Sequence, residues 1–203
     1  MFLASIPFLV RSLPSMVVWN FPTKEKKIYL TFDDGPTPEI TPVILDYLKA
    51  YNAKGTFFCL GKNIKSHSSL FDRITEEGHA IGNHTHNHLN GWKTKNNIYY
   101  DDISLAHKEN PSKLFRPPYG KIKAIQAFRL RKNYKIIMWD VLSGDYNQKI
   151  SQEQCLKNVL RHTRPGSIVV FHDSYKAQKN LLYTLPKMLE YFSSKGFSFA
   201  PIT

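Results

Sequence analysis

Two short segments combine carboxylates and imidazoles at spacings that suit a catalytic metal ion. Thr31-Phe-Asp-Asp-Gly-Pro36 places two adjacent carboxylates directly after a β-branched and aromatic run. Asn83-His-Thr-His-Asn-His88 contains His84 and His88, which are four positions apart. On a helical turn this spacing puts both imidazoles on one face. Two histidines and one aspartate form a three-ligand zinc site with a position left open for water.

The two carboxylates can do different work. Ile28–Phe32 predicts a short buried strand, and Gly35-Pro36 must end it. Neighbouring side chains on a strand point in opposite directions, so one of Asp33 and Asp34 could hold the cation while the other faces a reacting water. His86 lies two positions from each proposed histidine ligand, so on a helical turn it would point away from the metal.

Each segment also has an ordinary interpretation. Asp-Asp-Gly-Pro is common in turns, because Asp and Gly tolerate turn dihedral angles and Pro stops a strand. Three histidines in five residues often form a solvated loop that binds metal adventitiously. The presence of both segments in one chain favours a metal-dependent hydrolase over either alternative.

Three later segments extend the pattern: Arg116-Pro-Pro-Tyr-Gly120, Trp139-Asp-Val-Leu-Ser-Gly-Asp145-Tyr146 and Val170-Phe-His172. With all five segments in this order and at about this spacing, the sequence resembles the polysaccharide deacetylases. These are metal-dependent carbohydrate esterases built on the NodB homology domain. The resemblance runs from about Val18 to the C-terminus, nearly the whole chain.

The resemblance implies hydrolysis of an acetamide, with Asp34, His84 and His88 as the metal ligands and Asp33 as the general base. Zinc held there would polarise the amide carbonyl and lower the pKa of a bound water; Co²⁺ or Ni²⁺ would fit the same ligands. By resemblance, the backbone N–H of Tyr119 would help the metal to stabilise the oxyanion.

His172 is expected to be the general acid, because a protonated imidazole can deliver a proton to nitrogen near neutral pH. The resemblance suggests that Arg116 orients Asp33 and that Asp145 pairs with His172 or Arg116. Taken singly, Arg116 could instead be a surface cation, Asp145 a turn acid and His172 a core imidazole. Two further acids could share the supporting roles: Asp140 and Asp173.

Aromatic side chains in or beside the motifs could stack on sugar rings. The candidates are Tyr119, Tyr146, Trp139 and Trp92, whereas Phe171 fits a core strand equally well. The sequence departs from the family pattern at three positions: Tyr146 replaces Trp, Leu142 replaces an acid and Val170 replaces Leu. These changes bear on substrate fit and leave the metal ligands intact.

The elements that must position these residues alternate between strand and helix. Seven strand-like runs are expected: 28–32, 55–60, 79–82, 113–116, 135–140, 167–172 and 196–200. Helix-like stretches are expected at 40–51, 63–77, 96–108, 121–132, 151–162 and 179–193. This alternation predicts a parallel sheet with covering helices, and the resemblance implies a distorted (β/α) barrel of about seven strands. The motif residues then gather at the carboxyl ends of the strands.

The 203 residues predict one catalytic domain, 18–203, after an apolar extended segment, 1–17. That segment has no basic start and is interrupted by Arg11 and two prolines, so it predicts neither a signal peptide nor a membrane span. We therefore expect a cytoplasmic or membrane-face protein. Cys59 and Cys155 are expected to be free buried thiols.

The formal charge of +12 favours polyanionic surroundings, with possible membrane-surface association. No compact nucleic-acid motif is present, so nucleic acid is not an expected partner, and the oligomeric state stays open. The leading hypothesis is an N-deacetylase acting on N-acetylhexosamine units of a glycan or glycoconjugate. Two alternatives remain: an amidase or deformylase acting on a small C–N substrate, and a catalytically silent glycan-binding protein.

Overall fold

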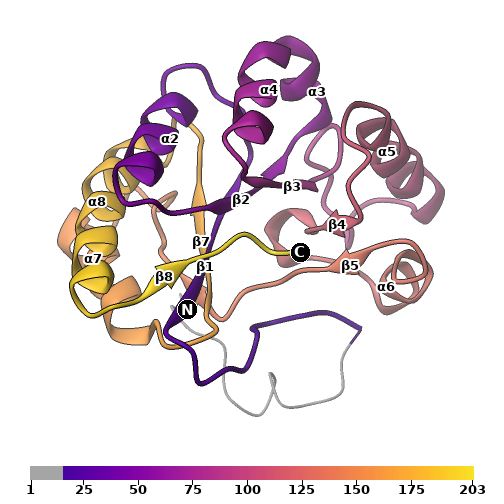
Figure 1. Cartoon of the computed structure of the whole chain (residues 1–203). Helices are drawn as coiled ribbons and strands as arrows, with labels where there is room; N and C mark the ends of the chain where they lie inside the picture. The colour runs from indigo at the N-terminus through magenta and orange to yellow at the C-terminus, as the bar shows by residue number, and fades with distance from the viewer. Residues whose placement is uncertain (1–15) are drawn as a thin grey trace.

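A single parallel sheet organises residues 16–203, the part of the chain that this computed structural model describes. The hydrogen-bonded order is β5-β4-β3-β2-β1-β7-β6, and β8 pairs with the beginning of β1. The strands are β1 (Lys27–Asp33), β2 (Gly55–Cys59), β3 (Ala80–Asn83), β4 (Leu114–Phe115), β5 (Lys135–Ile136), β6 (Val141–Leu142), β7 (Ile168–His172) and β8 (Ser198–Phe199). The sheet curls as a distorted β/α barrel (Figure 1).

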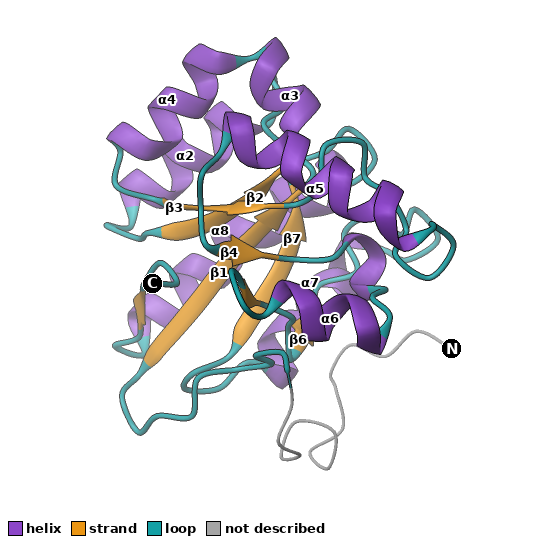
Figure 2. Cartoon of the chain, turned by 90° about the vertical axis from the view of Figure 1, so that its right-hand side faces the viewer, coloured by secondary structure: helices purple, strands orange, loops and turns teal. Residues whose placement is uncertain are grey.

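Helices surround the sheet on its outer side (Figures 1 and 2). They are α2 (Thr41–Ala50), α3 (Gly61–Ser66), α4 (Ser68–Glu76), α5 (Asn96–Glu109), α6 (Ala124–Leu130), α7 (Gln152–His162) and α8 (Gln178–Ser194), with a short 3₁₀ turn, η1 (Pro118–Gly120). In α2, Pro42 occupies the first turn, where its missing N–H leaves no bond unmade.

Strand register brings the motif residues to one edge of the sheet. In the parallel pairings, Asp33 lies opposite both Phe58 of β2 and His172 of β7. Asn83, which precedes the first motif histidine, lies opposite Phe115 of β4. Because the strands are parallel, their carboxyl ends share this edge, as in other barrels of βα units.

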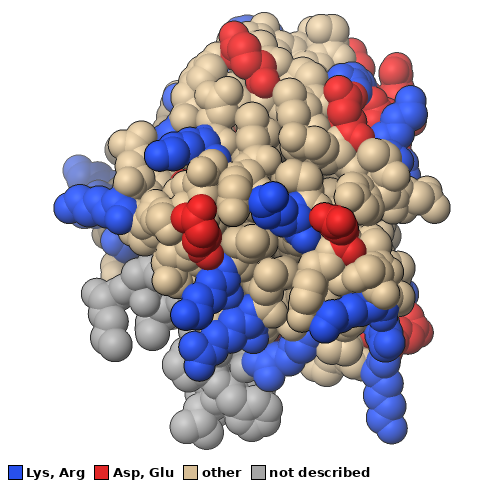
Figure 3. Space-filling view, turned by 90° about the vertical axis from the view of Figure 1, so that its left-hand side faces the viewer, with Lys and Arg blue, Asp and Glu red and all other residues tan. Residues whose placement is uncertain are grey.

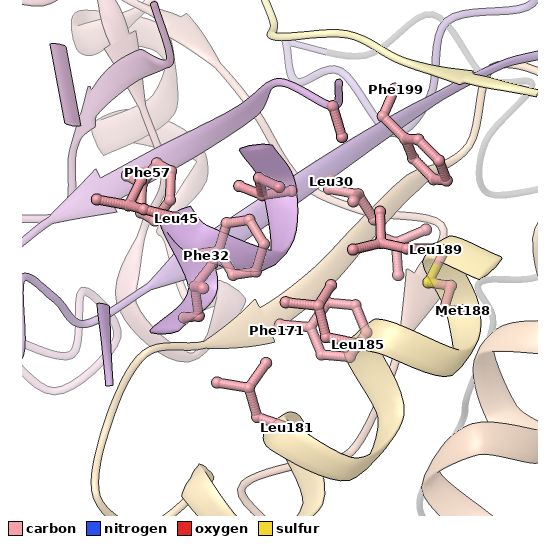
Figure 4. Packing of buried hydrophobic residues seen from close by; sticks show 14 of the residues in the cluster. Leu30, Phe32, Leu45, Phe57, Phe171, Leu181, Leu185, Met188, Leu189 and Phe199 are labelled. Carbon is pink, nitrogen blue, oxygen red and sulfur yellow. The ribbon is translucent and has the colours of Figure 1, made fainter. Parts of the chain in front are cut away.

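The main core lies between the sheet and helices α2, α7 and α8. Phe32 of β1 stacks on Phe57 of β2, with ring centroids 4.8 Å apart, and packs on Phe171 of β7 at 6.1 Å. From α8, Leu181 and Leu185 point into the same cluster (Figure 4). β1, buried by neighbours on both edges and by α8, is the strand on which the site is built.

The predicted fold class is confirmed, and each predicted strand is present with shorter bounds at most ends. Residues 137–140 are not strand, and β6, which the sequence did not predict, follows them. The predicted helix 63–77 is wrong: α3 and α4 are separate helices that meet at His67, whose φ of −138° is not helical. The predicted helix 121–132 shrinks to α6. Both cysteines are free and buried, as expected.

The described chain begins with two isolated bridges, from Val18 to Ile137 and from Asn20 to Ser167. The predicted extended segment 1–17 lies, for residues 1–15, outside the described residues, so the domain division at residue 18 stays a prediction. Within residues 16–203, the helices are all too short or too polar to span a bilayer.

We predict that Leu185→Ala lowers the free energy of unfolding by about 2–5 kcal/mol, because it opens a cavity in the fully buried face of α8. The matched control is Leu105→Ala on α5, where the side chain is 40% exposed and the loss should stay within about 1 kcal/mol. Urea unfolding followed by circular dichroism measures both. Equal losses would contradict this assignment of the core.

Candidate metal centre and active site

Three side chains converge beyond the ends of β1 and β3. Asp34 follows β1, His84 follows β3, and His88 lies in the loop after it. One ligand atom from each lies within 4.8 Å of the others, and the described residues contain no other such cluster. Nε2 of His88 is 3.2 Å from Asp34 Oδ1, and Nε2 of His84 is 3.7 Å from the same oxygen. The structure thus brings together the three predicted metal ligands.

The predicted helical turn over His84–His88 is wrong. This segment is irregular, and Thr85 and His88 have φ values of 67° and 61°. Non-glycine residues rarely adopt positive φ, and a β-branched residue such as Thr85 does so only under strong constraint. The imidazoles converge because of this constrained loop, and their ring centroids are 5.2 Å apart.

The histidine loop is held by an acid from α5. Asp102 accepts hydrogen bonds from the backbone N–H groups of His86 and Asn87, at 2.9 and 3.0 Å, and from the Asn87 side chain. At the start of the loop, Asn83 Oδ1 accepts the N–H of Thr85 at 2.8 Å. His86 is turned toward Gly61 and lies outside the ligand cluster. Sequence analysis missed Asp102, because a single acid within a helical pattern carries no signal of its distant partner.

The hydrogen bond at Nδ1 of His84 leaves Nε2 free to act as the metal ligand. Nδ1 lies 2.8 Å from the carbonyl oxygen of Arg116, so an Nδ1–H tautomer donates there and leaves the Nε2 lone pair facing Asp34. Burial lowers the pKa of His84 to about 4, although Asp33 opposes the shift. The ring is therefore neutral at pH 7, which metal binding requires.

Asp34 supplies the anionic donor. Its Oδ1 is buried and receives no well-directed hydrogen bond from residues 16–203, although His88 Nε2 is close. Burial opposes ionisation, but His88, His172 and His84 outweigh it and lower the pKa of Asp34 below its usual range. A buried, ionised oxygen that lacks a proper donor and faces two imidazole nitrogens fits a divalent cation, so these residues suit the metal that the motifs imply.

Asp33 lies against a completely buried arginine. Nη1 of Arg116 donates to Asp33 Oδ1 and to Thr31 Oγ1, both at 2.7 Å. Its Nε and Nη2 donate to the carbonyls of Ile137 and Met138. Burial lowers the pKa of Arg116 and Asp33 opposes this shift, but the ordinary value is so high that the guanidinium stays charged. Arg116 therefore fixes the direction of the Asp33 carboxylate.

His172, at the end of β7, pairs with Asp145. Its Nδ1 is 2.8 Å from Asp145 Oδ1, and its backbone N–H donates to Oδ2 at 2.7 Å. Of the two partners left open for Asp145, the structure thus places it against His172 and away from Arg116. Burial lowers the pKa of His172, but the charge and hydrogen bond of Asp145 outweigh it and raise the pKa to about 9. The imidazolium persists at neutral pH.

The ligand cluster, Asp33 and His172 open into one pocket of about 360 Å³. Its other lining residues are Tyr119, Trp139, Leu142, Tyr146, Val170, Ser174 and Lys176. The three departures from the family pattern therefore line this pocket. Tyr119, at φ 61°, also places its hydroxyl 3.1 Å from His88 Nδ1. Trp92 does not line the pocket; its Nε1–H donates to the carbonyl of Ile122.

Two further acids lie near the site in different positions. Asp173 braces the loop after Asp34: its Oδ1 accepts the N–H of Gly35 at 2.9 Å, and its Oδ2 accepts the hydroxyl of Thr41 at 2.6 Å. Burial raises the pKa of Asp173 to about 8. Asp140 faces the beginning of β7, where it accepts the N–H of Ile168. Sequence analysis named both acids and could not separate these positions.

Comparison with known proteins agrees with the site. Residues 20–133 match the family described as polysaccharide deacetylase. The chain belongs to this family. A peptidoglycan-N-acetylglucosamine deacetylase from Bacillus cereus is 34% identical over 189 residues, covering 89% of this chain and 68% of that protein. A second from the same species is 32% identical over 195 residues, covering 92% and 91%.

Solved structures extend the likeness to three dimensions. The crystal structure of a peptidoglycan N-acetylglucosamine deacetylase superposes with a TM-score of 0.87 at 33% identity, covering 92% of this chain and 91% of that one. A family 4 carbohydrate esterase from Streptomyces lividans gives 0.78 at 26% identity, covering 87% and 93%. The chain is thus a polysaccharide N-deacetylase, a hydrolase whose motif residues surround the pocket described above.

We predict that Asp145→Asn moves the alkaline limb of the deacetylase pH profile toward lower pH by about one unit or more. A protonated His172 is retained below its raised pKa of about 9 and is lost as pH rises through that value. Without the Asp145 charge, burial lowers the pKa, so the loss begins at lower pH. The measurement is kcat/KM from pH 6 to 10.

Asp140→Asn is the matched control, because Asp140 is equally buried and contacts backbone at the other end of β7. It should lower stability and leave the pH profile in place. An unshifted limb in Asp145→Asn would show that another group sets it.

Proposed function

We propose that this polysaccharide deacetylase removes the acetyl group from N-acetylglucosamine units of peptidoglycan or a closely related glycan and releases acetate. The observation that carries the proposal is the content of one pocket: Asp33, His172 and the ligand cluster of Asp34, His84 and His88 all line it. The names of the Bacillus cereus relatives support the choice of sugar. N-acetylmuramic acid is the second choice, since a relative at 32% identity is named for it.

We further propose zinc as the metal, because two imidazoles and one carboxylate with an open position form its usual catalytic site. Co²⁺ and Ni²⁺ suit the same donors. When bound, the ion would polarise the acetyl carbonyl and lower the pKa of a water molecule.

In this proposal, the protein residues move two protons. Asp33, directed by Arg116, takes a proton from the attacking water as its oxygen bonds to the carbonyl carbon. The backbone N–H of Tyr119 donates to the oxyanion that forms. His172 then gives its proton to the sugar nitrogen as the C–N bond breaks, leaving acetate and a free amine. Asp145 holds the imidazolium in position before this transfer.

Aromatic side chains that line the pocket would hold the sugar. Tyr119 and Trp139 come from the third and fourth motifs, and Tyr146 makes an edge contact with His172 at 5.0 Å between ring centroids. Tyr146, Leu142 and Val170 form the part of the lining that differs from the usual family pattern. We propose that these three residues tune which neighbouring sugar units are accepted.

The defining test is acetate release from N-acetylglucosamine oligomers by chelator-treated protein, with and without added zinc. We expect activity to vanish on chelation, to return with metal, and to be absent from Asp34→Ala in both conditions, because the anionic ligand is missing. Stoichiometric metal binding by the unmodified chain without acetate release would favour a small-amide substrate or a silent glycan-binding site. Oligomer binding without turnover would identify the latter.

We predict that Asp33→Asn lowers kcat by about 10²–10⁴-fold while metal stoichiometry is unchanged. Asn keeps an oxygen that can accept from Arg116 and has no basic carboxylate, so the fold and the ligand cluster should survive. Asp101→Asn serves as the control for the change from Asp to Asn, since Asp101 is exposed on α5 and does not line the pocket, and its turnover should be unchanged. Unchanged turnover in Asp33→Asn would show that the assigned base is wrong.

A further inference from the structure

An apolar ridge faces solvent along α6. Ile125 and Phe128 are 63% and 52% exposed, whereas the opposite face of the same helix buries Gln126, Ala127 and Leu130. Trp92, 60% exposed, lies beside the beginning of this helix. Large apolar side chains exposed together require an explanation, because a single soluble domain gains nothing from leaving them in water.

Hydrogen bonds hold the loop that carries Trp92 against the segment around α6. The Trp92 indole donates to the carbonyl of Ile122 at 3.0 Å, Gln126 Nε2 donates to the carbonyl of Gly91 at 3.0 Å, and Lys123 Nζ donates to the carbonyl of Thr94 at 2.8 Å. The loop that carries Trp92 is thereby tied to the segment that leads into α6. Figure 2 shows α5 and α6 together on the face turned to the viewer.

The two chain segments that carry this ridge have charge of one sign, although α5 beside them also carries the acids Asp101 and Glu109 at its surface (Figure 2). Neither 78–100 nor 110–139 contains Asp or Glu. The same two ranges hold ten basic residues: Lys93, Lys95, Lys113, Arg116, Lys121, Lys123, Arg129, Arg131, Lys132 and Lys135. All of them except the buried Arg116 are at least partly exposed. On the opposite face of the molecule, basic and acidic side chains are interspersed (Figure 3).

A basic hollow of about 610 Å³ lies next to the ridge, between α5 and α6. Lys113, Arg129, Lys132 and His107 line it, and no acid is among the described residues that do so. The Arg129 guanidinium stacks over the Tyr100 ring at 4.2 Å. A hollow with this lining suits a phosphate group, because several cations can contact its oxygens at once.

We propose that the α6 face is a docking surface for a membrane that contains anionic phospholipid. Ile125, Phe128 and Trp92 would enter the boundary between headgroups and acyl chains, and the basic hollow would receive a lipid phosphate. Apolar side chains combined with surrounding cations are what interfacial membrane binding requires, and Trp is enriched at that depth. A soluble polyanion would account for the charge and would leave the apolar ridge without a partner.

This surface adjoins the catalytic pocket. Tyr119 lines the pocket, and two residues later Lys121 places its ammonium group 5.4 Å from the centre of the Trp92 ring. Docking through α6 would therefore hold the pocket beside the membrane, where it would reach glycan close to the lipid surface. The docking itself does not depend on the reaction proposed above.

The test is sedimentation with vesicles of pure phosphatidylcholine and of phosphatidylcholine mixed with phosphatidylglycerol, using the whole chain. We expect binding to the mixed vesicles only, and a loss of about ten-fold or more in the Ile125→Ser, Phe128→Ser double variant. The matched control is Tyr191→Ser, an exposed aromatic on α8, which should bind as the unmodified chain does. Acetate release from soluble oligomers should be the same in all of these proteins, which separates a docking defect from misfolding.

Charge is tested in the same assay. Arg129→Glu with Lys132→Glu should abolish binding, whereas Lys157→Glu with Lys187→Glu, on α7 and α8, should reduce it only slightly. If the mixed vesicles fail to bind, or if the serine double variant binds as well as the unmodified chain, the proposal is overturned. Full competition by millimolar inorganic phosphate at constant ionic strength would likewise show a site for phosphate alone, without membrane insertion.

Discussion

The ion pair between Arg116 and Asp33 is the constraint on which the site depends. A guanidinium with no exposed surface is tolerated only when its donors are satisfied, and here they reach Asp33, Thr31 and two backbone carbonyls. This requirement ties the end of β1 to the chain that follows β5. The carbonyl of Arg116 also receives the His84 ring, so one residue positions both the carboxylate and a metal ligand.

Around this pair, regular structure supports irregular backbone. Asp34, Thr85, His88 and Tyr119 all have positive φ, and each contributes to the pocket or to the loop that forms it. Such conformations cost about 1–3 kcal/mol each and persist only when the surroundings impose them. The paired strands and the aromatic core beneath them supply that support. Asp173 holds the loop after Asp34, and Asp102 holds the loop that carries His88, through hydrogen bonds to backbone N–H groups.

Sequence patterns predicted the parallel sheet, the gathering of motif residues at the carboxyl ends of its strands and the identity of the converging residues, because buried strands and motif order are local features of the chain. The helical turn at the histidines was wrong because spacing alone cannot reveal that Thr85 adopts positive φ. β6 escaped notice because its two residues, Val141–Leu142, come directly after the run 135–140, which was predicted as one strand. The partner of Asp145, and the role of Asp102, depend on contacts between distant segments, which single-sequence reasoning does not capture.

The position of β1 inside the sheet affects the order in which the fold can form during synthesis. β1 pairs with β2, which follows it closely in the sequence, and with β7, which lies much later in the sequence and ends at His172. A growing chain therefore holds all three clustered ligands long before β7 is made, while one edge of an apolar strand stays open to unwanted pairing. Because the proposed general acid His172 ends β7, hydrolytic competence must come last during synthesis.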